Sequence, residues 1–303
     1  VMEIADRITG MRDGVITGHC MPQDVTINDL ASMMVKREIK VNEHMRAETV
    51  SPEVYFEVKD LLLTESEKVI LDHISLKIHK GEILGIAGVE GNGQTELIRC
   101  LTGLQKPDTM ELIVDGEAVT GNASDFIRQG IGHVPEDRLG TAVVENDSIS
   151  TNLMLGYHFK ERFRKGRWMD YNKADTFGNE CIETYSIKAP SSKTTIAEMS
   201  GGNQQKVVIA RVFSENPKVV ICAQPTRGVD IGSIEYIHRR MREFVGTEHA
   251  MLLISADLEE VKAMSDRIAV IFKGKIVAEG STDQFDDTQL GLYMTGAGTE
   301  EER

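Results

Sequence analysis

The chain has 303 residues, with 34 Lys and Arg against 48 Asp and Glu and a net charge of −14 at neutral pH. This length allows one large or two modest domains, and the excess of carboxylates argues against a nucleic-acid partner because it repels phosphate backbones. The 4 cysteines are scattered without a CxxC pair, which argues against a zinc site or a disulfide framework. No apolar run approaches the ~20 residues that span a bilayer and the first residues carry no signal core, so we expect a cytoplasmic chain.

The beginning of the chain is a diverged copy of its end. Residues 1–35 align without a gap on residues 261–295, at an offset of 260 positions. Both copies predict a short helix, an apolar strand, a glycine turn, a second strand and an acid-capped helix. We therefore predict that residues 1–38 are the C-terminal tail of a preceding domain of the same kind. The identical pairs are Val1/Val261, Asp6/Asp266, Arg7/Arg267, Ile8/Ile268, Gly14/Gly274, Ile16/Ile276, Leu30/Leu290 and Met34/Met294.

The remainder divides into a linker, one complete domain and a tail. Residues 39–52 are charged and lack apolar periodicity, as expected of a linker. We expect a complete domain over residues 53–290 and a C-terminal tail over 291–303. Within the domain, β-type runs from Val54 to Val119 precede a helical insert at about 140–200. Strands are then predicted at Val219–Ala223, Met251–Ser255 and Ile268–Phe272, alternating with helices as in a mostly parallel sheet covered on both faces.

A glycine-rich loop separates a predicted strand from a helix predicted over Thr95–Leu104. Gly88 to Thr95 fits GxxxxGK[ST] at every fixed position except one, where Gln94 replaces the lysine. Such a loop curls backbone N–H groups around a phosphate, and Thr95 is a weak candidate ligand for magnesium. Without the lysine, phosphate affinity and charge stabilisation both fall. The candidate nucleotide-binding residues are Gly88, Gly91, Asn92, Gly93, Gln94, Thr95 and Glu96.

This loop has two other interpretations. Taken alone, it also fits a plain turn between a strand and a helix. A dinucleotide-binding GxGxxG is disfavoured, because Glu96 stands where the third glycine belongs.

A second motif decides the context of the loop. Met199 to Lys206 reads Met-Ser-Gly-Gly-Asn-Gln-Gln-Lys. It resembles the signature motif of the nucleotide-binding domains of ATP-binding cassette (ABC) transporters, which reads LSGGNQQK in sugar and nucleoside importers. Pro135 to Arg138 resembles the Q-loop region of the same group, with Glu136 where most cassettes carry glutamine. The resemblance implies that Ser200, Gly201 and Gly202 reach the γ-phosphate of ATP held by a partner domain. The full set of candidate signature residues is Ser200, Gly201, Gly202, Asn203 and Gln204.

The catalytic positions of the resemblance are altered. The strand from Val219 leads to Ala223 and Gln224, where the Walker B motif has Asp-Glu, and Ala256 replaces the switch histidine of the H-loop. Asp230 keeps the D-loop carboxylate. The adenine-stacking aromatic has no counterpart at Thr64–Glu67, and Tyr55 and Phe56 lie early for that role. With Gln94, Ala223, Gln224 and Ala256 changed together, we expect no catalytic residue in cis and no ATP hydrolysis by this domain alone.

The resemblance implies an α/β fold, the P-loop NTPase fold of ABC type, with a mostly parallel core sheet, an antiparallel β subdomain and a helical insert. It also implies a peripheral protein at the cytoplasmic face of the membrane. We expect this degenerate second cassette of a nucleoside or simple-sugar importer to hold ATP and Mg²⁺ weakly or not at all, and to lend its signature to a first ABC domain of the same chain. The basic-membrane-protein type of nucleoside importer is most similar. The implied partners are transmembrane permease subunits and, indirectly, a substrate-binding lipoprotein.

Two alternatives stay open. A fully active ATPase of a ribose- or galactose-type importer would need another base, for which Glu90 and Glu136 are the nearest candidates. A non-transport ABC protein acting on ribosomes or DNA would need a basic face. The only candidate for such a face is one cluster of basic residues. We interpret it as a solvated helix end or loop or, failing that, as a contact with membrane subunits or lipid headgroups. It consists of Lys160, Arg162, Arg164, Lys165 and Arg167.

Overall fold

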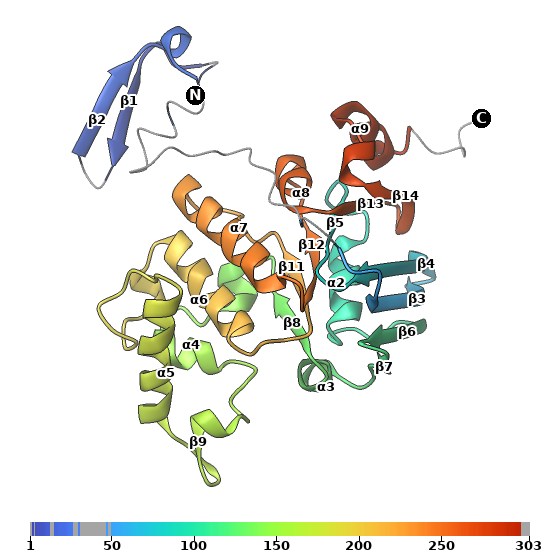
Figure 1. The fold of residues 1–303 in the computed structure, drawn as a ribbon, viewed down its shortest axis with the longest axis horizontal. Coiled ribbons are helices and arrows are strands. Elements are labelled where there is room, and N and C mark those ends of the chain that lie inside the picture. The colour runs from blue at the N-terminus through green and yellow to red at the C-terminus, as the bar shows by residue number, and fades with distance from the viewer. Residues whose placement is uncertain are drawn as a thin grey trace.

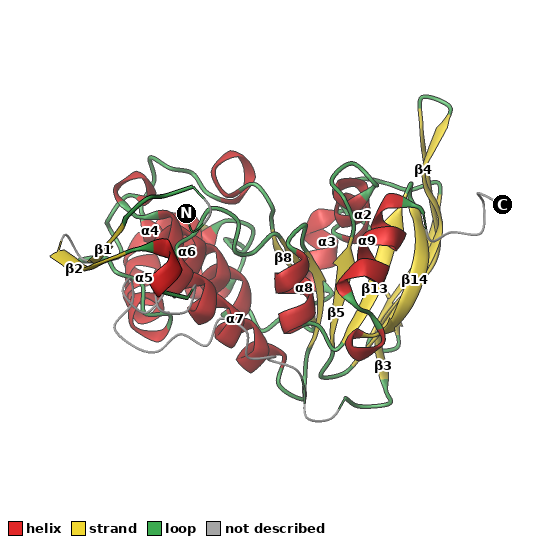
Figure 2. Cartoon of the chain, turned by 90° about the horizontal axis from the view of Figure 1, so that it is seen from above, coloured by secondary structure: helices red, strands yellow, loops and turns green. Residues whose placement is uncertain are grey.

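The computed structural model describes residues 2, 4–12, 15–26, 30, 47 and 50–297. Figure 2 shows most strands gathered in one lobe and the helices α4, α5 and α6 in a second lobe. The helix predicted after residue 26 in the first copy of the repeat lies outside the described residues, as does most of the predicted linker 39–52. None of the helices in the described part of the chain is long and apolar enough to span a bilayer.

A six-stranded sheet forms the centre, in the order β14-β13-β5-β12-β11-β8. All pairings in it are parallel except that of β13 with β14. The central strands β5, β11 and β12 are buried along their whole length, which explains their uninterrupted apolar runs. The strands are β5 (Ile83–Ala87), β8 (Ile131–Val134), β11 (Val219–Ala223), β12 (Ala250–Ile254), β13 (Arg267–Phe272) and β14 (Lys275–Ser281). The expectation of an α/β fold with a mostly parallel sheet is confirmed.

Alternate residues of these strands enter different cores, because successive side chains point to opposite faces. On one face, Leu84 and Leu252 share a core with α2 (Gln94–Leu101) and with an antiparallel sheet in the order β4-β3-β6-β7. The antiparallel strands are β3 (Val54–Glu65), β4 (Lys68–His79), β6 (Thr109–Val114) and β7 (Glu117–Ala118). On the other face lie α6 (Gly201–Phe213), α7 (Ile231–Val245), α8 (Leu258–Met264) and α9 (Asp287–Thr295).

The segment predicted as a helical insert is only partly helical. It contains a π-helical turn at Arg138–Ala142, α4 (Ile149–Met154), a short hairpin of β9 (Arg164–Lys165) and β10 (Trp168–Met169), and α5 (Tyr171–Thr184). Gly166, with φ +62, makes the turn that interrupts the helical pattern. A further short helix, α3 (Ala123–Arg128), precedes β8. The helix predicted at Thr95–Leu104 begins at Gln94 and ends at Leu101.

The C-terminal boundary differs from the expected one. The sequence predicts a tail from residue 291, but α9 continues to Thr295. Leu290 is fully buried, and Tyr293 and Met294 pack against the same cluster as β13. The helix is therefore held by the core of the domain beyond the expected boundary.

Two hairpins far apart in the sequence have the same internal geometry. β1 (Ile8–Arg12) pairs with β2 (Val15–Cys20), and the register shifts between Gly10 and Met11. β13 pairs with β14 in the register offset by 260 positions, and its shift falls between Val270 and Ile271. A 3₁₀ turn follows each hairpin, at Pro22–Asp24 and at Thr282–Gln284. The β1–β2 hairpin lies apart from the central sheet (Figure 1).

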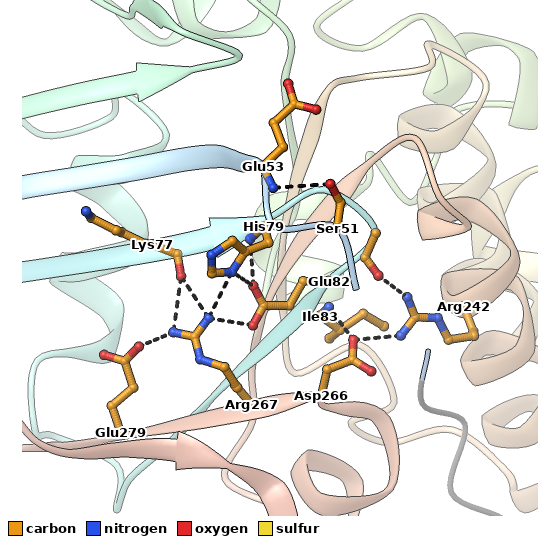
Figure 3. A network of polar contacts seen from close by, with 11 residues as sticks. Ser51, Glu53, Lys77, His79, Glu82, Ile83, Arg242, Asp266, Arg267 and Glu279 are labelled. Carbon is orange, nitrogen blue, oxygen red and sulfur yellow. Dashed lines mark hydrogen bonds and ion pairs between the residues drawn. The ribbon is translucent and has the colours of Figure 1, made fainter. Parts of the chain in front are cut away.

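The amino edge of the central sheet is held by buried acidic side chains. Asp266 accepts hydrogen bonds from the backbone N–H of Ile83 at 2.8 Å and of Ala47 at 2.7 Å, and it pairs with Arg242 at 2.9 Å. Glu82, 1% exposed, pairs with Arg267 at 2.7 Å and accepts from His79. Figure 3 shows this network, which joins the start of β5 to the neighbouring strands and to α7. It lies at the end of the sheet opposite the phosphate loop.

Candidate nucleotide site

The glycine-rich loop lies between β5 and α2, where the sequence predicts it. Gly91 and Gly93 have φ angles of +92° and +102°, in the region that favours glycine, and Gly93 is the N-cap of α2. No atom lies within 4 Å of a Cβ built on Gly91, so the backbone there is open to a ligand. The loop therefore directs the N-terminus of α2 and its free N–H groups toward an open space, the arrangement that binds phosphate.

The side chain of Gln94 folds back into this loop. Its Oε1 accepts from the backbone N–H of Asn92 at 3.1 Å, and its Nε2 donates to the carbonyl of Val89 at 2.9 Å. A Cβ on Gly88 would lie 2.7 Å from that same Nε2. The neutral amide thus occupies one of the N–H groups of the loop and adds no positive charge.

Asn92 ties the loop to the turn between β13 and β14. Its Oδ1 accepts from the N–H of Lys273 at 2.9 Å and its Nδ2 donates to Val89 at 3.0 Å. The backbone N–H of Gly274 donates to the Asn92 carbonyl at 3.0 Å. The strand pair that closes the domain therefore holds the loop in place.

Segments far apart in the sequence surround one cavity of about 200 Å³ in front of the loop. Gly88, Gly91, Gln94 and Thr95 line it from the loop and α2. Other walls come from Glu136 after β8, from Ala223 and Gln224 at the end of β11, and from Ser255 and Ala256 after β12. The structure thus brings Gln94, Glu136, Ala223, Gln224 and Ala256 together, at the carboxyl edge of the parallel strands where such folds bind ligands.

The cavity is poorly equipped for a metal ion. Ala223 is fully buried and offers no oxygen, and Gln224 carries an amide with its Oε1 3.4 Å from the Ser255 hydroxyl. The described residues contain no group of three or more His, Cys, Asp or Glu side chains that could hold a metal ion. Thr95 is the hydroxyl that remains on the α2 side. The backbone of the loop fits a phosphate group, but these side chains do not fit a catalytic Mg²⁺ site.

An arginine outside the predicted set stands at the rim of the cavity. Arg227, in the loop between β11 and α7, pairs with Glu136 at 2.6 Å and with Glu90 at 3.5 Å. Glu90 and Glu136 are the carboxylates considered as substitute bases. Both carboxylates therefore contact the same guanidinium.

The signature residues lie outside the cavity, at the N-terminus of α6. Ser200 is the exposed N-cap, and its Oγ accepts from Asn203 Nδ2 at 2.9 Å. Gly202 is packed so tightly that a Cβ would lie 2.1 Å from Ser233 Oγ and 2.7 Å from Asp230 Oδ2. Asp230 itself caps α7 through the N–H of Ser233 at 3.0 Å. The signature and the D-loop carboxylate therefore form one packed unit.

Gln204 has a structural position within this unit. It is 7% exposed, its Nε2 donates to the Ile196 carbonyl at 3.0 Å, and its Oε1 accepts from Arg138 Nε at 3.1 Å. Arg138 also donates to the carbonyl of Arg227 at 3.2 Å. Arg138 and Arg227 thus connect the cavity to the signature. The sequence does not single out either arginine as a functional residue. A contact such as that of Arg227 with Glu136, 91 positions apart, leaves no signal in a single sequence.

A second hollow of about 300 Å³ adjoins the loop on its other side. Val69 and Ile70 of β4 line it together with the loop glycines. Tyr55 and Phe56, the aromatics considered for stacking on adenine, are 8% and 0% exposed in the core. They are therefore withheld from any ligand, and the side chains of this hollow include the charged Glu96 and Lys273 besides the two aliphatic ones.

A family model described as ABC transporter matches residues 71–227, more than half of the chain. The chain belongs to the ABC transporter family. It is 36% identical over 99% of its length to the nucleoside import ATP-binding protein NupA of Lactococcus lactis, and covers 60% of that protein. It is also 36% identical to the glucose import ATP-binding protein TsgD13 of Haloferax volcanii, covering 98% of this chain and 55% of that one. The chain thus spans less than two thirds of these relatives.

Solved structures agree with the fold of this family member. A nucleotide-free ATP-binding cassette from an ABC transporter superposes with a TM-score of 0.66, at 22% identity, over 79% of this chain and 98% of the cassette. The expected P-loop NTPase fold of ABC type is therefore confirmed. The roles predicted for individual site residues remain predictions.

Proposed function

We propose that this chain is the second, non-catalytic cassette of a tandem ABC ATPase that drives the import of nucleosides or simple sugars. The observation that carries the proposal is the composition of the single cavity in front of the phosphate loop. Gln94, Ala223, Gln224 and Ala256 meet there. The family resemblance expects a lysine, two carboxylates and a histidine at these places, so the cavity keeps the shape of a nucleotide site without its reactive groups.

The altered side chains predict static or weak nucleotide binding. The loop backbone still offers N–H groups at the start of α2, although the Gln94 amide competes for one of them. No cation replaces the lysine inside the loop, and Arg227 at the rim is engaged by two carboxylates. Charge stabilisation and a general base each contribute factors of about 10² or more to such reactions. We therefore expect no hydrolysis in cis.

A first cassette in the same polypeptide is supported by the two matching hairpins. In the C-terminal copy, Ile271 is fully buried against the sheet of its own domain. Its counterpart Met11 is 59% exposed, and Val15 and Ile16 beside it are 66% and 53% exposed. A hairpin of this kind needs a sheet to cover its apolar side chains. We infer that the sheet of a preceding cassette covers β1–β2, in keeping with relatives that are longer than this chain.

Ser200, Gly201 and Gly202 are proposed to serve the nucleotide of that first cassette. The backbone N–H groups at the start of α6 are free of side-chain caps, and the exposed Ser200 hydroxyl is available beside them. Both kinds of donor suit an anionic phosphate. The cavity described above would face the first cassette's signature in turn.

Permease subunits are the proposed membrane partners, which places the protein at the cytoplasmic face. A groove of about 680 Å³ runs between α2, α3 and the segment after α4, with Ile98, Ile127 and Leu155 among its lining residues. His133 forms part of its floor, and its buried Nε2 has no hydrogen-bond partner in the described structure. Glu136 lines both the groove and the nucleotide cavity. A segment docked in the groove would therefore contact Glu136, a residue that also lines the nucleotide cavity. A substrate-binding lipoprotein would act on the permease from the other side.

Two measurements test the proposal. Calorimetric titration of Mg-ATP into the chain, with analysis of products in the same cell, is expected to give weak or no binding and no ADP. ADP at the rate of an active cassette would instead identify a complete ATPase. The gene itself tests the tandem arrangement: because the repeat offset is 260, the counterpart of Gly88 lies about 170 residues upstream of Val1. A GxxxxGK[ST] loop is expected there, and its absence would refute the tandem arrangement.

A further inference from the structure

The hairpin β9–β10 projects from the helical lobe with the only tryptophan of the chain near its tip. Trp168 is 80% exposed, and Tyr171 just after the hairpin is 64% exposed. Lys165 and Arg167 flank the Gly166 turn, and both are exposed. Figure 1 shows this hairpin as the part of the helical lobe that reaches furthest beyond the rest at its lower edge. An exposed tryptophan beside two cations is unexpected in a chain of net charge −14.

The base of the hairpin is rigid, so the exposure of its tip is built in. Phe163 is fully buried in a cluster with Tyr157 and Ala174, against which Met169 also packs. The N–H of Asp170 donates to the Phe163 carbonyl at 2.9 Å, and Lys173 Nζ donates to the Arg164 carbonyl at 2.8 Å. These contacts fix both strands of the hairpin. Trp168 therefore stays in solvent although its neighbours are packed.

The cations of this region divide into two groups. At the base, Lys160 and Arg162 pair with the buried carboxylate of Glu215 at 3.3 and 2.6 Å, so one of their two positive charges is balanced within the fold. At the tip, Lys165 and Arg167 are exposed to solvent. Asp170, the nearest acid in the sequence, caps α5 through the N–H of Asn172. The tip thus carries a local positive charge.

We propose that the tip of the β9–β10 hairpin inserts into the interface of an anionic lipid bilayer. Trp and Tyr are the side chains that favour the level of the headgroups, because their rings have an apolar body and a polar edge. Lysine and arginine beside them bind anionic headgroups. This combination fits a lipid surface better than a nucleic-acid duplex, which the overall charge of the chain repels.

The neighbourhood of the hairpin agrees with this orientation. Tyr157 packs against its base and also lines the groove assigned above to the permease. If that groove meets a membrane subunit, the hairpin lies beside the subunit and close to the bilayer. This one step rests on the proposed function. The composition and exposure of the tip do not, and lipid binding can be measured without ATP or a permease.

Trp168 reports directly on insertion of the tip, because the chain has 1 tryptophan and all tryptophan fluorescence therefore comes from this residue. We would titrate the 303-residue chain with vesicles of phosphatidylglycerol and phosphatidylcholine in equal parts, and with vesicles of phosphatidylcholine alone. The anionic vesicles are expected to shift the emission to shorter wavelength and to co-sediment the protein at low salt. The neutral vesicles are expected to do so weakly, and added salt should weaken the anionic case.

Charge-reversed variants separate the tip from the overall charge. K165E/R167E keeps the reporter and is expected to lower affinity about 25-fold or more, since each cation near an anionic surface strengthens binding roughly fivefold. The matched control K68E/K193E reverses two exposed lysines elsewhere, Lys68 on β4 and Lys193, and should lose far less. W168A, followed by co-sedimentation, should bind more weakly than the wild type.

Several outcomes would overturn the proposal. One is an unshifted Trp168 emission in anionic vesicles, whether or not the protein sediments. A second is an equal loss of binding in K165E/R167E and in the control. A third is a larger emission shift with a DNA duplex than with vesicles under the same conditions. Circular dichroism checks that the variants are folded, and hydrolysis measurements do not enter, so a failure here is distinct from a failure of the proposed cassette role.

Discussion

The amino and carboxyl edges of the central sheet differ in the charged side chains that they contain. At the amino edge, the buried acids Asp266 and Glu82 are matched with Arg242 and Arg267 and with backbone N–H groups (Figure 3). At the carboxyl edge, the cavity is lined by Gln94, Ala223, Gln224 and Ala256, which carry no charge. The charges that hold the domain together are thus present at one edge, whereas the proposed function has the charges that act on nucleotide absent from the other.

The strongest test of this contrast removes a charge from the amino edge. Asp266→Ala leaves Arg242 without its carboxylate and two backbone N–H groups without their acceptor. We expect a loss of about 3–5 kcal/mol in the free energy of unfolding, because breaking a buried pair strands the other charge. Urea denaturation measures it. The control D72A removes a half-buried partner of Lys275 at 3.2 Å and should cost less than about 1 kcal/mol. Equal losses would contradict the distinction.

The corresponding test at the carboxyl edge restores charge. In Q94K/A223D/Q224E we expect Mg-ATP to bind about 10- to 100-fold more tightly, since a hydrogen bond to a charged group contributes roughly 1.5–3 kcal/mol. Calorimetry measures the affinity, and Q94M serves as the control that vacates the loop without adding a cation. Unchanged affinity in the restored variant, with its fold intact, would count against the assignment of these positions.

Local motifs and distant contacts differ in how far the sequence predicts them. Gly88 to Thr95 and Ser200 to Gln204 are contiguous, and short-range geometry requires their residue types, so both are recognisable in the sequence alone. The pairs Glu136–Arg227 and Asp266–Ile83 join positions 91 and 183 apart, which only the strand order brings together. The β9–β10 hairpin falls within the predicted helical insert, because its strands are only two residues long. Periodicity cannot detect so short an element.

The repeat is predictable from the sequence only in part. Its alignment locates two hairpins, and Asp6 and Arg7 correspond to Asp266 and Arg267, the residues that bind the amino edge in the C-terminal copy. In the first copy the same two residues are exposed. The alignment thus points to residues that have a structural task, and the contacts at the amino edge show what that task is.

Acid should lower the free energy of unfolding of the domain through His133, the histidine in the floor of the groove. Burial, with Arg211 nearby, lowers the pKa of His133 to about 4 from 6.5. The unfolded chain therefore binds a proton below about pH 6.5 that the folded chain refuses, so stability is full above that pH and falls between 6.5 and 4. We expect a contribution of about 1–2 kcal/mol to be lost between pH 7.5 and pH 5. Denaturation at both values measures it. H133Q should reduce that difference, and H158Q, which changes an exposed histidine, should not.

The smallest expected effect concerns the guanidinium at the cavity rim, and its sign is the informative part. Arg227 has a 56% exposed side chain, so R227A should change stability by less than about 1 kcal/mol. It leaves Glu136 and Glu90 uncompensated near the phosphate loop, and in the Q94K/A223D/Q224E background we expect Mg-ATP to bind a few-fold more weakly. E136Q, which removes one of those negative charges, should bind at least as tightly as the background. If R227A instead strengthens binding, the guanidinium blocks the cavity rather than balancing its carboxylates.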